Sequence, residues 1–355
     1  MDKNKKIKMF FVAVMILFLA SLGLTSLMKN ETIVIENQNK DADDLVQDEI
    51  FAESLTVEVD KSPLTGLACE NPNQRPIAVT ISGDKEARPL SGISEADLVI
   101  EMPAVTGSIT RYLAFFACNK MEEIGSVRSA RHDHIPLAMG FGAIIAHWGG
   151  SHFALDKLDA GIMDNINALY LENSVFYRKL SIYAPHNGFT SFERLEKYSS
   201  EKGYGLTNTF EGYKFWDEEN PNQGKGRITI SYPGSFKVEY EYSSDTNEYL
   251  RFKGGTREMD KNTSAQVVAK NVLVMYAASR QIEGQYNDMD IEGEGDAIIF
   301  QNGEEIKGKW SKDKNDLNSK LFFYNEDGEE IKLVPGQTWI QVVELTQDVD
   351  WTFGF

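Results

Sequence analysis

The chain has 355 residues and a formal net charge of -18, with 54 acidic against 36 basic side chains. This field repels polyanions and no basic stripe offsets it, so nucleic acid is excluded as an expected partner. All five histidines nevertheless fall between His132 and His186, in a window that also holds Arg128, Arg131 and Arg178. We therefore expect one polar site with cations set into an otherwise acidic protein.

The N-terminus predicts a membrane anchor. Four lysines precede residues 9–28, an uncharged run of 20 residues, and at 1.5 Å per residue this run spans a hydrocarbon core of roughly 30 Å. The lysines should stay cytoplasmic, which places the bulk of the chain outside the cell membrane. We predict that residues 1–30 form an uncleaved transmembrane signal anchor. A cleaved signal peptide is the alternative, although its apolar region is usually shorter.

The region outside the membrane divides into a stalk and two expected domains. Residues 31–61 are rich in Asp, Glu and Asn and poor in aromatic residues, a composition that buries little and predicts an acidic, flexible stalk. Residues 31–355 carry 31 basic and 53 acidic side chains, so the exterior is more acidic than the whole chain. The remaining span is long for one hydrophobic core, which favours two domains, 62–215 and 216–355.

The first expected domain has an α/β or α+β pattern. Apolar and β-prone runs indicate strands, some of them covered on both faces, and helical periods follow two of these runs. The expected strands are 77–81, 98–102, 109–118 and 143–148, and the expected helices are 153–158 and 192–198.

The second expected domain is mostly antiparallel β. Ile228, Ile230 and Tyr232 alternate with polar residues, which is typical of a strand with one buried face. Asn302-Gly303 and Asp327-Gly328 are strong hairpin signals with β-prone flanks, and Trp339 lies in a late strand.

Two cysteines, Cys69 and Cys118, lie outside the membrane. An oxidising compartment permits a disulfide between them, whereas two buried free thiols would pack equally well as small hydrophobes. Their spacing does not choose between these interpretations.

The turn after the strand at 143–148 is the first candidate for ligand binding. The strand ends at His147, Gly149 and Gly150 permit positive φ, and Ser151 can cap a helix that begins near residue 152. The start of such a helix favours an anion, and ligands of open α/β sheets bind at the carboxyl ends of strands. A tight strand-to-helix connection without a ligand is the alternative.

Arginines strengthen the expectation of an anion. Arg128 and Arg131, with Ser129 between them, are three residues apart and would share one face if helical, an arrangement suited to bidentate contacts with phosphate or carboxylate. Internal salt bridges to the many acids are the alternative. Arg111 is a lone cation in an apolar strand, and Glu101 is its expected partner if it is buried.

His186 and His147 could serve as general acid and base, because imidazole titrates near neutral pH. Pro185 stiffens the backbone before His186 and Asn187. Core histidines that donate to carbonyl groups are the alternative. The pair His132 and His134 lacks the other ligands that zinc requires, so we expect no metal and no cofactor.

Many ordered motifs across residues 62–350 resemble the YerB-like family of bacterial lipoproteins. They include Gly-Ser-Val-Arg-Ser-Ala-Arg at 125–131, His-x-Gly-Gly-Ser at 147–151, Ala-Pro-His-Asn at 184–187 and Pro-Gly-Gln-Thr-Trp-Ile at 335–340. The resemblance implies a cell-envelope protein of Gram-positive bacteria with an N-terminal domain of unknown function, and no activity comes with it. The family pattern covers Arg111, Arg128, Arg131, His147, Ser151, His186 and Asn187. It does not usually include His132, His134 or His152, and this chain lacks the lipobox cysteine.

The sequence thus favours a membrane-anchored, extracytoplasmic envelope protein that binds an anionic or sugar-containing ligand, such as cell-wall material, in a cleft of the N-terminal domain. The residues expected to contact the ligand are Glu101, Arg111, Arg128, Ser129, Arg131, Gly149, Gly150, Ser151, Arg178 and Asn187. An envelope hydrolase or transferase that uses His147 and His186 is one alternative. A non-catalytic scaffold for wall-synthesis proteins is the other.

Overall fold

The computed structural model describes residues 60–354. The predicted anchor, and the predicted stalk up to residue 59, lie outside the described residues. Within residues 60–354, no helix is both long enough and apolar enough to cross a membrane.

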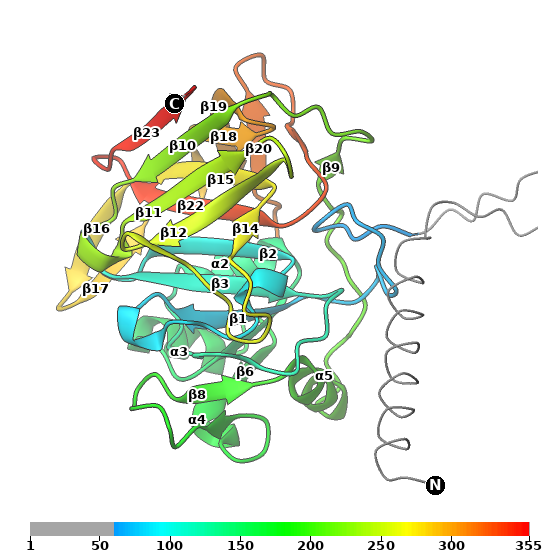
Figure 1. Ribbon diagram of the computed structural model, residues 1–355. Coiled ribbons are helices and arrows are strands. Elements are labelled where there is room, and N and C mark those ends of the chain that lie inside the picture. Colours follow the sequence, from blue (N-terminus) through cyan, green and yellow to red (C-terminus); the bar gives the residue numbers. More distant parts are fainter. Residues whose placement is uncertain (1–59, 355) are drawn as a thin grey trace, which may run out of the picture. The chain divides into compact units, whose positions relative to one another are not determined.

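A ten-stranded sheet runs through the middle of the described chain (Figure 1). In spatial order its strands are β20 (Phe322–Asn325), β19 (Glu304–Lys312), β18 (Gly293–Gln301), β15 (Asn271–Ala277), β22 (Thr338–Glu344), β2 (Leu98–Pro103), β3 (Thr110–Phe116), β1 (Ile77–Ser82), β5 (Ile144–His147) and β6 (Asn165–Asn167). The regions 62–215 and 216–355 each supply five of these strands. They meet where β22 pairs in parallel with β2, from Thr338 opposite Leu98 to Gln341 opposite Glu101.

The expected fold class is confirmed. In the first region β1, β5 and β6 are parallel neighbours and helices follow, including α3 (His152–Asp159) and α5 (Phe192–Glu201). In the second region most pairs are antiparallel, as in the hairpin of β18 and β19. Asn302 and Gly303 both have positive φ at its turn, which is the backbone shape that a two-residue hairpin requires.

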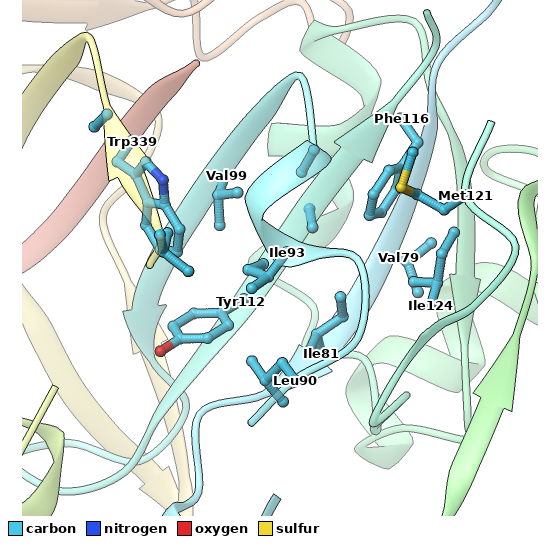
Figure 2. Packing of buried hydrophobic residues seen from close by; sticks show 14 of the residues in the cluster. Val79, Ile81, Leu90, Ile93, Val99, Tyr112, Phe116, Met121, Ile124 and Trp339 are labelled. Carbon is cyan, nitrogen blue, oxygen red and sulfur yellow. The ribbon is translucent and has the colours of Figure 1, made fainter. Parts of the chain in front are cut away.

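One face of the main sheet is covered by a second sheet. It consists of β13 (Thr256–Arg257), β12 (Glu248–Lys253), β11 (Val238–Ser243), β10 (Lys225–Ile230) and β23 (Val349–Phe353), with β14 (Val268–Ala269) paired to β12. Buried residues alternate along β11, so the inward side chains Val238, Tyr240 and Tyr242 join one core cluster with Val99 and Trp339 of the main sheet. Figure 2 shows Val99 and Trp339 within this cluster.

The opposite face of the main sheet is covered in part by helices. Ile135, Leu137 and Ala138 of α2 (His134–Gly140) and Leu158 of α3 pack with Leu113 and other main-sheet residues of the same face. Every residue of β3 is consequently buried, as predicted for a strand covered on both sides. Each fully buried Val, Leu, Ile or Phe contributes about 1.5–3 kcal/mol to folding.

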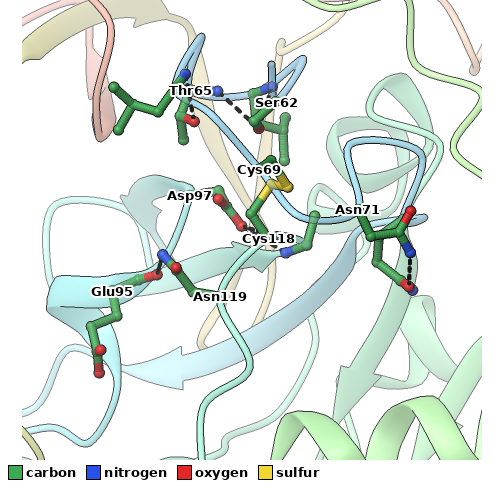
Figure 3. Close-up of a disulfide and its surroundings, with 12 residues drawn as sticks. Ser62, Thr65, Cys69, Asn71, Glu95, Asp97, Cys118 and Asn119 are labelled. Atoms are coloured by element: carbon green, nitrogen blue, oxygen red, sulfur yellow. Dashed lines mark hydrogen bonds between the residues drawn. A yellow bond between two sulfur atoms is a disulfide. The ribbon is translucent and has the colours of Figure 1, made fainter. Parts of the chain in front are cut away.

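A disulfide joins Cys69 and Cys118, with 5.7 Å between their Cα atoms. It connects the segment before β1 to the residues that follow β3. Beside it, the buried Asp97 carboxylate accepts hydrogen bonds from the backbone N–H groups of Ala117 and Cys118, at 2.6 and 3.2 Å (Figure 3). The sequence spacing allowed either two free thiols or a disulfide, and the structure shows that the two cysteines form a disulfide.

Replacing both cysteines by alanine should lower the free energy of unfolding by about 2–4 kcal/mol. The bridge spans 49 residues of sequence, and it restricts the unfolded chain by closing that loop. Urea denaturation of the oxidised wild-type protein and the double variant measures the difference. Reduction of the wild type should produce a similar loss, and equal stability of all three samples would contradict the expectation.

Candidate anion-binding site

An extended segment, 126–131, carries two of the predicted site arginines between the ends of β1 and β5. Arg128 donates its backbone N–H to the Thr80 carbonyl at 2.8 Å and accepts from the Trp148 N–H at 2.9 Å, and Ala130 donates to Gly149 at 2.9 Å. The helical arrangement considered for Arg128 and Arg131 is therefore wrong, because these backbone groups bond to neighbouring strands and turns.

Arg111 reaches the same region from β3. Strand β3 runs antiparallel to β1, and Arg111 lies opposite Ser82, the last residue of β1. Since β1 and β5 are parallel, their carboxyl ends share one edge of the sheet. Arg111 and the 126–131 segment thus meet at the edge where ligands of α/β sheets commonly bind.

The three guanidinium groups of Arg111, Arg128 and Arg131 form few contacts with negatively charged groups. Arg111 donates from Nη1 to the Ser129 carbonyl at 2.8 Å, and Arg131 donates from Nε to the Ala104 carbonyl at 3.3 Å. Within residues 60–354 their one ion pair joins Arg128 Nη2 to Asp84 Oδ2 at 3.6 Å. Arg111 and Arg131 are only 3% and 6% exposed, so bulk solvent screens their charges little.

The electrostatics of the cluster follow from this imbalance. Burial, followed by the charges of Arg131 and Arg128, lowers the pKa of Arg111, and burial also lowers the pKa of each of the other two arginines. Protonation is thus less favourable here than in water. A bound anion would reverse the effect by supplying the opposite charge.

His186 lies beside the same arginine. Its Nδ1 is 3.9 Å from Asp84 Oδ2, and the carbonyl of Pro185 accepts a 3.4 Å hydrogen bond from Arg128 Nη1. Burial, and then the charge of Arg128, lowers the pKa of His186.

Several buried polar atoms around the cluster have no hydrogen-bond partner within the described part of the chain. These atoms are Arg111 Nε, Arg128 Nε, Ser126 Oγ, His134 Nε2 and His186 Nδ1. Buried donors and acceptors are normally satisfied, so their concentration at one place makes it a candidate for contacts with a polar ligand.

His147 has a different environment from His186. It is fully buried, its Nδ1 is 2.8 Å from the Gly149 carbonyl oxygen, and its Nε2 is 3.3 Å from Asn165 Oδ1. Because both ring nitrogens already have partners, His147 fastens the turn that follows β5.

The turn has the local structure expected from its sequence. Gly149 has a φ of +67°, and Ser151 Oγ accepts a hydrogen bond from the Ala154 N–H at 3.2 Å. Ser151 therefore caps α3. A Cβ at Gly150 would lie 3.1 Å from the Ala130 carbonyl oxygen, so this glycine permits the close approach of the 126–131 segment.

Arg178 and Asn187 form a pair of their own. Arg178 donates to Asn187 Oδ1 and to Glu172 Oε1, both at 2.9 Å, and its guanidinium lies 4.1 Å from the centre of the Trp148 ring. In contrast to Arg111, Arg178 has a carboxylate and an aromatic face as partners.

Glu101 does not join the arginine cluster, and its expected pairing with Arg111 is wrong. Glu101 lies opposite Tyr112 in the sheet, whereas Arg111 lies opposite Met102. Because side chains alternate between the faces of a strand, Glu101 and Arg111 point to opposite sides.

On its own side, Glu101 belongs to a buried network with β12. It forms ion pairs with Arg251, at 2.5 Å, and with Lys253, while Arg251 also binds Glu258 at 2.6 Å. All four side chains are at most 1% exposed in these pairs. Two negatively charged and two positively charged side chains meet here, so the charges of this network balance one another.

The sequence reasoning missed Asp84, Ser126, Arg251 and Lys253. Asp84 comes just after an expected strand, and the carboxyl ends of strands are where ligands of α/β sheets bind, so its position was a usable signal. Arg251 and Lys253 offered a misleading signal, because they alternate with the apolar residues Leu250 and Phe252. The pattern would place the apolar residues inside, whereas β12 buries the two cations.

Two family models match the chain. Residues 64–205 match the N-terminal domain of a protein of unknown function (DUF3048), and residues 228–340 match its C-terminal domain. The chain is also 34% identical, over 290 residues, to "Putative lipoprotein YerB" of Bacillus subtilis (strain 168), covering 80% of this chain and 86% of the relative. The chain belongs to the DUF3048 family.

A solved structure of the family shares the fold. The crystal structure of YerB protein from Bacillus subtilis matches with a TM-score of 0.73 and 33% identity, over 82% of this chain and 99% of that one. The arginine cluster lies within the part matched by the family's N-terminal domain. The resemblance drawn from the sequence motifs is thereby confirmed.

Replacing Glu101 by alanine should lower the free energy of unfolding by about 3–5 kcal/mol, because Arg251 would stay buried with only Glu258 as its ion-pair partner and Lys253 with none. Urea denaturation of both proteins tests this. Glu201→Ala is the control, since Glu201 forms an exposed pair with Lys197 at 4.0 Å and its removal should cost at most about 0.5 kcal/mol. Equal losses in the two variants would contradict the structural role of the network.

Proposed function

We propose that this chain is an envelope protein held at the outer side of the cell membrane by residues 1–30. The hydrophobic run at 9–28 supports this placement, as does the word lipoprotein in the name of the Bacillus subtilis relative. Its N-terminal region binds an anionic ligand, such as a phosphate- or carboxylate-bearing fragment of cell-wall material, which can also contain sugar.

The observation that carries the proposal is the cluster of three arginines, two of them buried and one partly exposed, whose one ion pair among the described residues is with Asp84. Removing a charged group from water costs several kcal/mol unless another charge compensates it. Arg111 and Arg131 have carbonyl oxygens as partners, and Arg128 has Asp84 at 3.6 Å. An anion that contacts all three groups would supply the compensation.

The unpartnered atoms suggest how the anion is held. Arg111 Nε and Arg128 Nε have no hydrogen-bond acceptor among the described residues, and guanidinium groups bind phosphate or carboxylate through paired N–H donors. Arg128 has 20% side-chain exposure, so the ligand would enter past Arg128 toward the more deeply buried Arg111.

A hydrolase or transferase that uses His186 is the second candidate. His186 Nδ1 has no hydrogen-bond partner among the described residues, and its lowered pKa favours the neutral imidazole that can accept a proton. His147 supports this candidate less well, because both of its ring nitrogens are bonded.

Arg128→Gln and Arg111→Gln should each weaken the binding of inorganic phosphate by about tenfold or more, since a hydrogen bond to a charged group contributes about 1.5–3 kcal/mol. Isothermal titration of the full-length protein in detergent micelles measures the affinity, and sedimentation with purified cell walls gives a second readout. Arg257→Gln is the charge-matched control, because Arg257 is exposed on β13. Unchanged affinity in the Arg128 and Arg111 variants would refute the proposal.

His186→Gln separates binding from catalysis. We expect phosphate to bind this variant within a few fold of the wild type, because His186 contributes no formal charge in its neutral form. Turnover of a panel of phosphoester and glycan substrates is measured in parallel. Turnover by the wild type that disappears in His186→Gln would favour the enzyme over a binding protein.

A further inference from the structure

Three potential metal ligands lie together, two of them directly after Arg131 in the sequence. His132 Nε2 is 3.3 Å from Asp133 Oδ1 and 3.1 Å from Asp288 Oδ1. One ligand atom from each of the three residues lies within 4.8 Å of the other two. His132 and Asp288 are 156 residues apart in sequence, and tertiary packing alone brings them together.

The spacing fits a small divalent ion. Zinc binds imidazole nitrogen and carboxylate oxygen at about 2.0–2.2 Å, and a tetrahedral angle then separates neighbouring ligand atoms by roughly 3.3 Å. The two measured separations from His132 Nε2, 3.3 and 3.1 Å, agree with this value. A nitrogen ligand with two oxygen ligands is a set that zinc accepts, with water in the fourth position.

A second observation concerns the carboxylate of Asp133. Asp133 is only 3% exposed, and its Oδ2 has no hydrogen-bond partner within residues 60–354. One oxygen of this buried carboxylate is therefore left without a hydrogen bond from the described residues, and a metal ion bound at the cluster would contact the carboxylate.

The other ion pairs of Asp288 leave its Oδ1 facing His132. Arg280 pairs with Asp288 Oδ2 and with Asp290, while Asp288 Oδ1 is the oxygen that faces His132. His132 Nε2 and Asp288 Oδ1 share a 3.1 Å hydrogen bond, and a metal ion between the two atoms would replace this bond.

We propose that His132, Asp133 and Asp288 bind a divalent transition-metal ion, with Zn²⁺ as the best fit. His134, the other histidine suggested by the sequence spacing, is not a ligand, because its Nδ1 accepts the backbone N–H of Arg131 at 3.1 Å.

The ion would join two parts of the molecule. Asp288 belongs to β17 (Tyr286–Met289), which forms a hairpin with β16 (Ser279–Glu283), while His132 and Asp133 follow Arg131. The Arg131 guanidinium already lies 5.5 Å from the centre of the Tyr286 ring in the same hairpin. Metal binding would fasten this hairpin to the segment that carries Arg131, and it requires no anion at the arginine cluster.

Isothermal titration of the full-length protein in detergent micelles with ZnCl₂ tests the proposal. We expect one Zn²⁺ per chain, and at least a tenfold loss of affinity in His132→Ala, Asp133→Asn and Asp288→Asn. The two Asp→Asn changes preserve side-chain shape, so they remain informative if His132→Ala fails to fold. Circular dichroism of each variant checks the fold.

His152→Ala is the matched control, because His152 is a nearby histidine that pairs with Glu283 at 3.2 Å outside the ligand set. It should bind Zn²⁺ like the wild type. Hydrogen exchange at the amides of the β16–β17 hairpin should slow when Zn²⁺ is added to the wild type and not when it is added to Asp288→Asn. Absence of Zn²⁺ binding by the wild type, or equal losses in His152→Ala and His132→Ala, would overturn the proposal.

Discussion

The position of β22 is the constraint on which the rest of the fold depends. This late strand pairs in parallel with β15 on one side and β2 on the other, and six of its seven residues are buried. Without it, β2 and β15 would each present an unpaired edge with apolar side chains, a surface that promotes aggregation. The two regions that match separate family domains therefore share one sheet, and the two core clusters on its faces draw residues from both regions.

The same sheet carries buried charge on both faces, and the balance differs between them. On the side of β12, Glu101 and Glu258 offset Arg251 and Lys253 within hydrogen-bonding distance. Such a network holds the two sheets in register, and breaking it is costly. On the side of Arg111, the charges are predominantly positive. Among the described residues the three guanidiniums form one ion pair, with Asp84, and the charge of Asp133 also acts on Arg131. The network around Glu101 is balanced by its own residues, whereas the imbalance around Arg111 is the basis of the proposed anion site.

Much of the local structure could be predicted from the sequence, because its causes lie within a few residues. Alternation and apolar runs identified β1, β3, β5 and β10, and Asn302-Gly303 identified the hairpin of β18 and β19. Periodicity shows that a strand is buried, but it does not show which strand lies beside it. Trp339 therefore marked a late strand correctly, while its place at the centre of the sheet, between β15 and β2, depended on contacts with residues more than sixty positions away.

The same distinction between local and tertiary causes applies to the candidate site. The sequence by itself determined the residue types, the positive φ at Gly149 and the cap at Ser151, because backbone preference and short-range hydrogen bonds specify them. Only the tertiary structure decided the partners: strand register turned Glu101 away from Arg111, and packing placed Asp84 near Arg128 and Asp288 near His132. The physical reason is that charge compensation depends on distances through space, and strand pairing and sheet packing set those distances.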